Sequence, residues 1–227
     1  NDDEIIFILK DVALNALTLV DATMGAGDKL YIDGSNLTGT NAFTFDGSAE
    51  DDAAVLTITG GAAADTITGG DGADVINGGA GADKLSGDAG ADTFHIVDGD
   101  SGAWNIDSGN AKLASTVNFD IILDAAAGDV IDLTDAVQSE AAYGTFTTAT
   151  AGANLTATTT TDTIAQFIGT YDASANTFLS DTSGDDIMLA FKGTDAGDTT
   201  VDEAIIIVGQ TNVYEDSELV AGVLTIA

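Results

Sequence analysis

Four nine-residue units follow one another without a gap: GGAAADTIT (residues 60–68), GGDGADVIN (69–77), GGAGADKLS (78–86) and GDAGADTFH (87–95). A fixed period of this kind is typical of proteins built from stacked structural turns. The glycine-rich first half of each unit can turn tightly, because glycine accepts positive φ and lets backbones approach closely. The alternating second half is typical of a short strand with one side chain pointing inward. The repeat therefore predicts a β-solenoid in an all-β chain with minor α content.

Two positions of the unit predict what the stack contains. Position eight is always a large apolar residue, so stacking places these side chains in internal columns: Ile67, Ile76, Leu85 and Phe94. Position six is always aspartate, so stacking lines up carboxylates at the turns: Asp65, Asp74, Asp83 and Asp92. Stacked carboxylates repel one another unless a cation lies between them. Carbonyl and carboxylate oxygens without His or Cys favour calcium over zinc, and over magnesium with its strict octahedral geometry.

These units resemble the G-G-x-G-x-D-x-U-x repeats of RTX proteins, which form a parallel β-roll that binds calcium. The resemblance implies that calcium lies between turns two units apart, held by backbone carbonyls and by the position-six Asp of both turns. Asp65 would then share a site with Asp83, and Asp74 with Asp92, while Asp71 would add a side-chain oxygen. The implied metal ligands are Gly60, Ala62, Asp65, Gly69, Asp71, Asp74, Gly78, Ala80, Asp83, Gly87, Ala89 and Asp92.

The block departs from the family pattern at its two ends. Ala63 replaces a glycine in the first unit, and Asp88 replaces the second glycine of the last unit. The ends of solenoids are where repeats usually become irregular to cap the stack. A glycine-rich linker is the alternative interpretation. It gives no reason for Asp and large apolar residues to stay in register over four units.

Composition restricts the classes of function. The chain has 5 Lys and Arg against 38 Asp and Glu, for a formal net charge of −33. Such a chain repels nucleic acid and anionic membranes, and no segment approaches the roughly 20 apolar residues of a membrane helix. Yet 44% of the residues are hydrophobic, which favours a folded protein over a disordered acidic chain. The absence of Cys excludes disulfides and thiol catalysis.

The same sequence argues against an enzyme. His95 is the sole histidine, it falls at repeat position nine, and we expect it to face solvent. No HExxH, G-x-S-x-G or P-loop sequence is present. Acidic residues are abundant enough for a glycosidase pair, but an aromatic content of 6% offers few sugar platforms. We therefore expect a non-catalytic chain.

Residues 1–59 are expected to be a β-rich segment continuous with the roll of residues 60–95. Strand-like runs alternate there with turn signals, at 5–9, 17–21, 29–33, 43–46 and 55–59. Five acidic residues of this segment either extend the calcium array or, as we favour, form turns: Asp33, Asp46, Glu50, Asp51 and Asp52.

Residues 96–227 are expected to be a β-rich C-terminal cap with a secretion-signal region and one or two short helices. Residues 117–135 are either a hairpin with an acidic turn or a passage like that which follows the roll in RTX proteins. In the second case Asp120, Asp124, Asp129 and Asp132 would be ligands of a flanking calcium. The helix candidates are residues 135–146 and 161–171; in the latter, Asp162 would cap an apolar i, i+3, i+4, i+7 stripe. Strands are expected again at 177–181, 186–191, 204–209 and 223–227.

Together these features predict a non-catalytic, extracellular calcium-binding structural module that folds on calcium binding. The resemblance implies the C-terminal part of a larger bacterial protein that leaves a Gram-negative cell through the type I secretion machinery. The composition of residues 1–59 is similar to that of surface-layer proteins and adhesins. It favours a role at the cell surface or S-layer, with self-association or neighbouring surface-layer subunits as partners. The alternative is the secretion and folding domain of a secreted protease or lipase whose catalytic domain lies upstream.

Overall fold

The computed structural model describes residues 4–10, 16–20, 24–51, 53–97, 119–135, 145–148, 163–180, 184–191, 203–210, 219–220 and 222–227. These residues form β-strands, turns and loops, and no helix occurs among them. Within this part of the chain there is accordingly no helix long and apolar enough to cross a membrane. The strands are β1 (Glu4–Ile8), β2 (Ala16–Thr18), β3 (Lys29–Asp33), β4 (Thr44–Asp46), β5 (Val55–Thr59), β6 (Thr66–Gly70), β7 (Val75–Asn77), β8 (Lys84–Asp88), β9 (Thr93–Val97), β10 (Asp120–Ile122), β11 (Val130–Asp135), β12 (Thr145–Thr148), β13 (Thr163–Asp172), β14 (Thr177–Ser180), β15 (Asp186–Phe191), β16 (Glu203–Ile207), β17 (Leu219–Val220) and β18 (Val223–Thr225).

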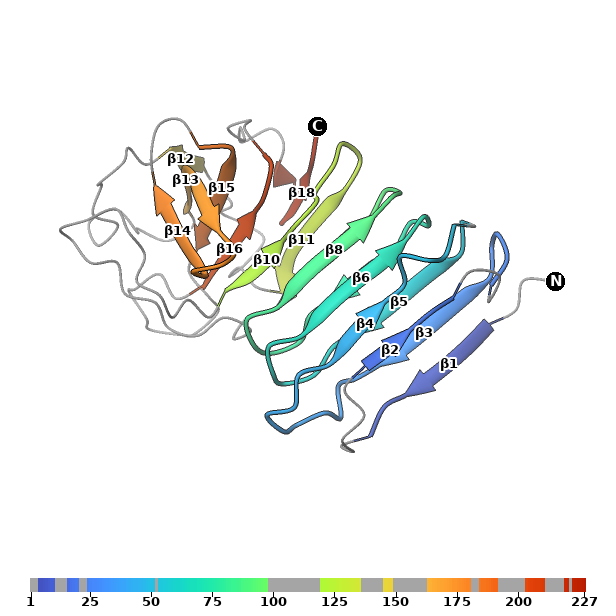
Figure 1. Ribbon diagram of the computed structural model, residues 1–227. Helices are drawn as coiled ribbons and strands as arrows, with labels where there is room; N and C mark the ends of the chain where they lie inside the picture. Colours follow the sequence, from blue (N-terminus) through green and yellow to red (C-terminus); the bar gives the residue numbers. More distant parts are fainter. Residues whose placement is uncertain are drawn as a thin grey trace.

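Successive strands from β1 to β11 alternate between two sheets. Sheet A has the order β1-β3-β5-β7-β9-β11-β18-β17, and sheet B has the order β12-β13-β15-β16-β10-β8-β6-β4-β2 with β14 beside β13. All pairs between the first eleven strands are parallel. Figure 1 shows these strands as a regular stack that begins at β1, near the N-terminus. The arrangement is consistent with the expected parallel β-roll.

The position-eight side chains form the core between the sheets, as the repeat predicts. Each of the four is fully shielded from solvent: Ile67, Ile76, Leu85 and Phe94. The strand register continues these columns beyond the repeats, because Phe45 pairs with Ile67 and Ile122 pairs with Leu85. The same core therefore runs through units that lack the nine-residue motif.

The units before the repeats are longer than nine residues. Ile32, Phe45 and Ile58 occupy the position-eight columns at intervals of 13 residues. The five strands predicted within residues 1–59 are all present. Two have the predicted bounds, at 29–33 and 55–59, and the bounds of the others differ by one to three residues. Because the extra residues fall in the turns, the period changes without disturbing the sheets.

The C-terminal part adds a second apolar layer on the outer face of sheet B. Strand β15 is antiparallel to both β13 and β16, and β12 is parallel to β13. Strand β16 joins the stack through a parallel pairing with β10. The buried residues of this layer are Phe119, Ile121, Phe167, Phe178, Met188, Ala190, Ala204 and Ile206. In Figure 1 the group formed by β12 to β16 lies at the end of the stack opposite β1.

One prediction for this half was wrong, and one of two open alternatives is excluded. Residues 163–172 form strand β13 and not a helix; Ile164 enters the core between the sheets while Phe167 enters the outer layer. A strand buried on both faces has apolar residues at many spacings, including those of a helix. Residues 117–135 do not form a hairpin, since β10 and β11 lie in different sheets. The other expected helix, 135–146, lies mostly outside the described residues.

Candidate metal centre

The turns of the repeats lie on two edges of the stack. Turns 60–65 and 78–83 lead from sheet A to sheet B, and we call their side the first edge. Turns 69–74 and 87–92 lead back to sheet A on the second edge. Each turn ends with the position-six aspartate, whose side chain folds into the turn. These aspartates are all buried, at 0–1% exposure: Asp65, Asp74, Asp83 and Asp92.

The buried aspartates form one ladder of hydrogen bonds along each edge. On the first edge the N–H of Asp65 donates to Oδ1 of Asp83, at 2.6 Å. On the second edge the N–H of Asp74 donates to Oδ1 of Asp92, at 2.9 Å. We call each aspartate of a ladder a rung. The pairs implied by the RTX resemblance are thus neighbouring rungs, which lie two units apart in sequence.

Both ladders continue beyond the repeats. The N–H of Asp83 donates to Oδ1 of Asp120 at 3.0 Å, and the N–H of Asp92 donates to Oδ1 of Asp129 at 2.9 Å. Asp120 and Asp129 thus occupy position six of two further units, which end at Leu123 and Asp132. These units lack the glycine pairs, but an Asp-x-Ile signal recurs nine residues apart, at 120–122 and 129–131.

The turns differ in what binds Oδ2, the second carboxylate oxygen of each aspartate. In the first two units the N–H of the position-two residue donates a hydrogen bond to this oxygen. Gly61 donates to Asp65 at 2.5 Å, and Gly70 donates to Asp74 at 2.9 Å. In the fourth unit position two is Asp88, which has φ +67° and donates its N–H to Asp124 at 2.9 Å. Oδ2 of Asp92 is consequently buried without a hydrogen-bond partner.

The position-one glycines leave room for oxygen atoms. A Cβ atom on Gly69 would lie 2.6 Å from the carbonyl oxygen of Gly87 and even closer to Oδ2 of Asp74. A Cβ on Gly60 would clash in the same way with the carbonyl of Gly78 and with Asp65. The position-three residues tie each turn to the preceding one, through N–H groups that bind its carbonyls: Ala62 to Leu37, Asp71 to Glu50, Ala80 to Gly61 and Ala89 to Gly70.

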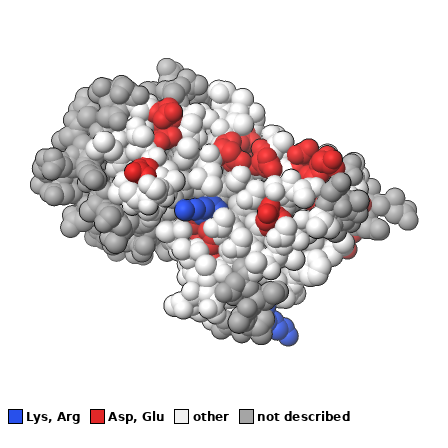
Figure 2. All heavy atoms as spheres, viewed as in Figure 1, with Lys and Arg blue, Asp and Glu red and all other residues white. Residues whose placement is uncertain are grey.

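The electrostatics of the second edge are unfavourable for ionised carboxylates. Burial raises the pKa of Asp74 to about 7, against the opposing effect of hydrogen bonds from Leu56 and Gly70, and the charges of Asp92 and Asp88 raise it further. Burial likewise raises the pKa of Asp92 to about 6, with added repulsion from Asp129, Asp124 and Asp88. On the exposed surface too, Asp and Glu groups recur on the face shown in Figure 2 and lysines are few.

These features fit a hard cation with oxygen ligands. The buried partnerless oxygen of Asp92 and the glycine-lined space beside it are what a cation between turns would use. Among the described residues no three His, Asp or Glu side chains converge on one point. Backbone carbonyls would therefore complete the coordination, and calcium accepts six to eight such oxygens in a flexible geometry.

Other acidic residues have different surroundings. Asp33 and Asp46 each bind the N–H and hydroxyl of the serine two residues later, which is a turn-forming role. Asp71 and Asp51 are exposed, and Asp52 lies outside the described part of the chain. The carboxylate of Asp124 binds the turn of the fourth unit, through the N–H groups of residues 87 and 88 and the hydroxyl of residue 86.

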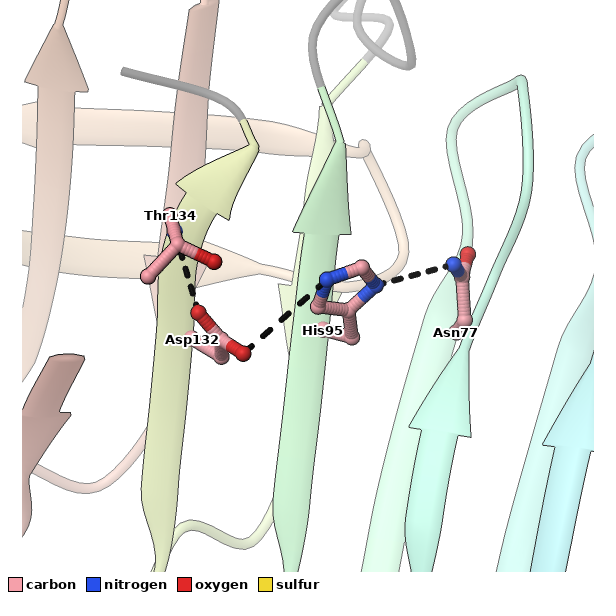
Figure 3. A network of polar contacts seen from close by, with 4 residues as sticks. All are labelled: Asn77, His95, Asp132 and Thr134. Carbon is pink, nitrogen blue, oxygen red and sulfur yellow. Dashed lines mark hydrogen bonds and ion pairs between the residues drawn. The ribbon is translucent and has the colours of Figure 1, made fainter. Parts of the chain in front are cut away.

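His95 and its neighbours form a column of position-nine residues on the outer face of sheet A (Figure 3). Nδ1 of His95 lies 3.2 Å from Nδ2 of Asn77, and Nε2 lies 3.9 Å from Oδ2 of Asp132. Asp132 also accepts a hydrogen bond from the N–H of Thr134 at 3.0 Å. The side chain of His95 is 27% exposed, so it is partly covered by these neighbours instead of facing solvent freely.

The fold and the ladders together define a class: a parallel, two-sheet repeat protein with regularly spaced carboxylates for a hard cation. Residues 59–94 match the family described as RTX calcium-binding nonapeptide repeat, with four copies. Residues 59–94 are therefore RTX-type calcium-binding repeats of a structural module. Proteins with such repeats are typically secreted by bacteria. A search of curated proteins returned no match for the chain.

The raised pKa values predict how stability depends on pH without calcium. Asp74 and Asp92 titrate near pH 7 and 6 when folded, but near pH 4 when unfolded, so the folded chain binds more protons between these limits. The free energy of unfolding in chelator should therefore fall as pH rises from about 4 to about 7. We expect a higher thermal midpoint at about pH 5 than at about pH 8.

The control for this measurement is Asp74→Asn, which cannot ionise at that rung. It should reduce the difference between the two thermal midpoints, whereas Asp33→Asn in an exposed turn should not. A midpoint in chelator that is equal or higher at the alkaline pH would contradict the proposed electrostatics.

The glycine-lined space predicts the effect of one added methyl group. Gly69→Ala would place Cβ against Asp74 and the carbonyl of Gly87, so we expect a loss of about 1–3 kcal/mol or more in the free energy of unfolding. It should also weaken calcium binding. The matched control is Gly25→Ala, whose Cβ would meet nothing nearer than 3.6 Å. Equal stability of the two variants in urea titrations with calcium would show that the space is not needed.

Proposed function

We propose that this chain is a non-catalytic structural module of an extracellular bacterial protein, folded as a β-roll that bound calcium stabilises. One observation carries the proposal: buried carboxylates occupy every rung of two ladders, and the charges that act on Asp74 and Asp92 are negative. Calcium ions between the turns would offset this repulsion. The ligands would be those implied at positions one, three and six of the four units, and Asp120 and Asp129 are candidates for further rungs.

Calcium then controls folding. Extracellular modules bind calcium with Kd of about 10⁻⁴–10⁻³ M. At a free concentration about ten times Kd, each site adds about 1.4 kcal/mol to the free energy of unfolding, and several sites add together. In a calcium-poor cytosol the same carboxylates repel one another and oppose folding. The chain stays loose enough for export by a type I secretion machinery and folds outside the cell.

The module is organised around the repeats. Residues 60–95 form the calcium-binding part, and residues 1–59 form a β-rich segment continuous with it. Support for this continuity comes from β1 to β5, which pair within the same two sheets as β6 to β9. Residues 96–227 form the C-terminal cap, with a secretion signal at its end.

The proposed place of action is the surface of a Gram-negative cell, within an S-layer or a similar assembly. The support is a net charge of −33 on a chain without Arg, because calcium can bridge acidic surfaces of neighbouring copies. The alternative, a secretion and folding domain attached to a hydrolase, uses the same calcium ladder but needs no assembly. Self-association in calcium distinguishes the two.

The test is a calcium titration from chelator to about 10 mM, a range set by the affinity of extracellular modules, followed by circular dichroism and light scattering. We expect a cooperative gain of β signal with calcium but not with magnesium, and growth of particles at higher calcium. Asp83→Asn should shift the folding transition to higher calcium, because it removes a charge from the first edge.

The matched control is Glu4→Gln, which removes the same charge from the exposed strand β1 and should leave the transition unchanged. A fold that is indifferent to calcium would contradict the proposal as a whole. Calcium-dependent folding of a chain that stays monomeric would reject the assembly role and favour the secretion domain.

A further inference from the structure

Glu50 is a buried carboxylate outside the nonapeptide repeats. It lies in the turn between β4 and β5, on the second edge, one turn before the first repeat turn of that edge. The residue is 2% exposed, and its Oε1 is buried without a hydrogen-bond partner. A glutamate in this state is unusual, because burying an ionised carboxylate costs much free energy unless a partner compensates it.

The chain contains its own comparison for this position. In the 13-residue units before the repeats, Met24, Leu37 and Glu50 are equivalent residues, and Met24 and Leu37 are buried in the core. Leu37 and Glu50 make the same backbone hydrogen bond. The N–H of Leu37 donates to the carbonyl of Gly34 at 2.8 Å, and the N–H of Glu50 donates to the carbonyl of Gly47 at 2.9 Å. Glu50 therefore places a carboxylate where the preceding units place an apolar side chain.

The turn that carries Glu50 has the backbone features of a repeat turn. A Cβ on Gly47 would lie 2.8 Å from the carbonyl oxygen of Gly69, just as a Cβ on Gly69 would lie 2.6 Å from that of Gly87. The position equivalent to the ladder aspartates is Leu56, whose N–H donates to Oδ1 of Asp74 at 2.8 Å. The turn thus has the glycine-lined space of a rung without its carboxylate.

The Cβ atom of Glu50 lies close to the first repeat turn of this edge. A Cβ added to Gly70 would be 3.3 Å from it, and the N–H of Gly70 binds Oδ2 of Asp74. The carbonyl of Glu50 also accepts the N–H of Asp71 at 3.0 Å. The side chain of Glu50 therefore begins beside the repeat turn that carries Asp74, and it belongs to a turn that lacks a position-six carboxylate.

We propose that Glu50 and Asp74, with backbone carbonyls of residues 47–51 and 69–74, hold a calcium ion one turn ahead of the RTX repeats. This inference rests on the proposed calcium-dependent fold and extends it to residues that the repeat motif does not include. The first edge has no counterpart, because its equivalent turn carries the apolar Leu37 in place of Glu50 and also has an apolar residue, Phe43, at position six. The second edge then holds one more ion than the nonapeptide units alone provide.

The test counts bound calcium by native mass spectrometry and calorimetric titration of the whole chain. Glu50→Gln removes the charge at nearly constant size, and Glu50→Leu copies the residue of the preceding unit. We expect each variant to bind one calcium fewer than the unmodified chain. Glu4→Gln, on the exposed strand β1, is the matched control and should keep the full number.

Thermal unfolding gives a second readout that a merely buried glutamate would not produce. Glu50→Leu removes a partnerless carboxylate, so it should raise the thermal midpoint in chelator and reduce the further rise caused by calcium. This variant keeps the test decisive if Glu50→Gln fails to fold. An unchanged calcium number with an equal rise in calcium would overturn the Glu50 site and leave the repeat sites intact. An unmodified chain that binds no calcium would overturn the proposed function itself.

Discussion

Like charges are buried next to one another along both edges of the stack, and the rest of the structure depends on how that repulsion is balanced. Hydrogen bonds from backbone N–H groups balance part of it, since each rung accepts the N–H of the rung two units earlier. They do not offset the whole cost, because burial, with added repulsion from Asp92 and Asp88, still raises the pKa of Asp74 to about 7. In the proposed function, a divalent cation between turns would supply the missing positive charge and let turns with many oxygens pack closely.

The apolar columns and the carboxylate ladders are separate parts of the design. The columns run through units of 13 residues and of nine, and through the two further units that contain Ile122 and Ile131. The ladders begin where position six changes from the apolar Phe43 and Leu56 to aspartate. The described units before the repeats therefore stack by apolar packing, while the repeats exchange part of that packing for buried carboxylates. In the proposed function, calcium dependence would be concentrated in one part of a continuous two-sheet stack.

Much of the fold could be predicted from the sequence, because a strict nine-residue period leaves few alternatives. The period places Ile76 in the core and Asp74 at a turn, and the structure places both there. The sequence indicates Asp129 as a possible ligand of a flanking calcium but not as a member of the same ladder, because inserted residues interrupt the period and its unit lacks the glycine pair. The helix predicted over residues 161–171 was wrong because a strand buried on both faces has apolar residues at helical spacings too. The burial of Glu50 depends on which turns stack against it, and no local pattern contains that information.

The most direct test of the account is a crystal structure of the chain grown in calcium, with anomalous difference density measured at a wavelength where calcium scatters. The account predicts density between Asp65 and Asp83 on the first edge and between Asp74 and Asp92 on the second edge, coordinated by carbonyls of the glycine-rich turns. The same two-sheet stack with no calcium density between these turns would show that hydrogen bonds and protonation alone balance the ladders, and it would contradict the central claim.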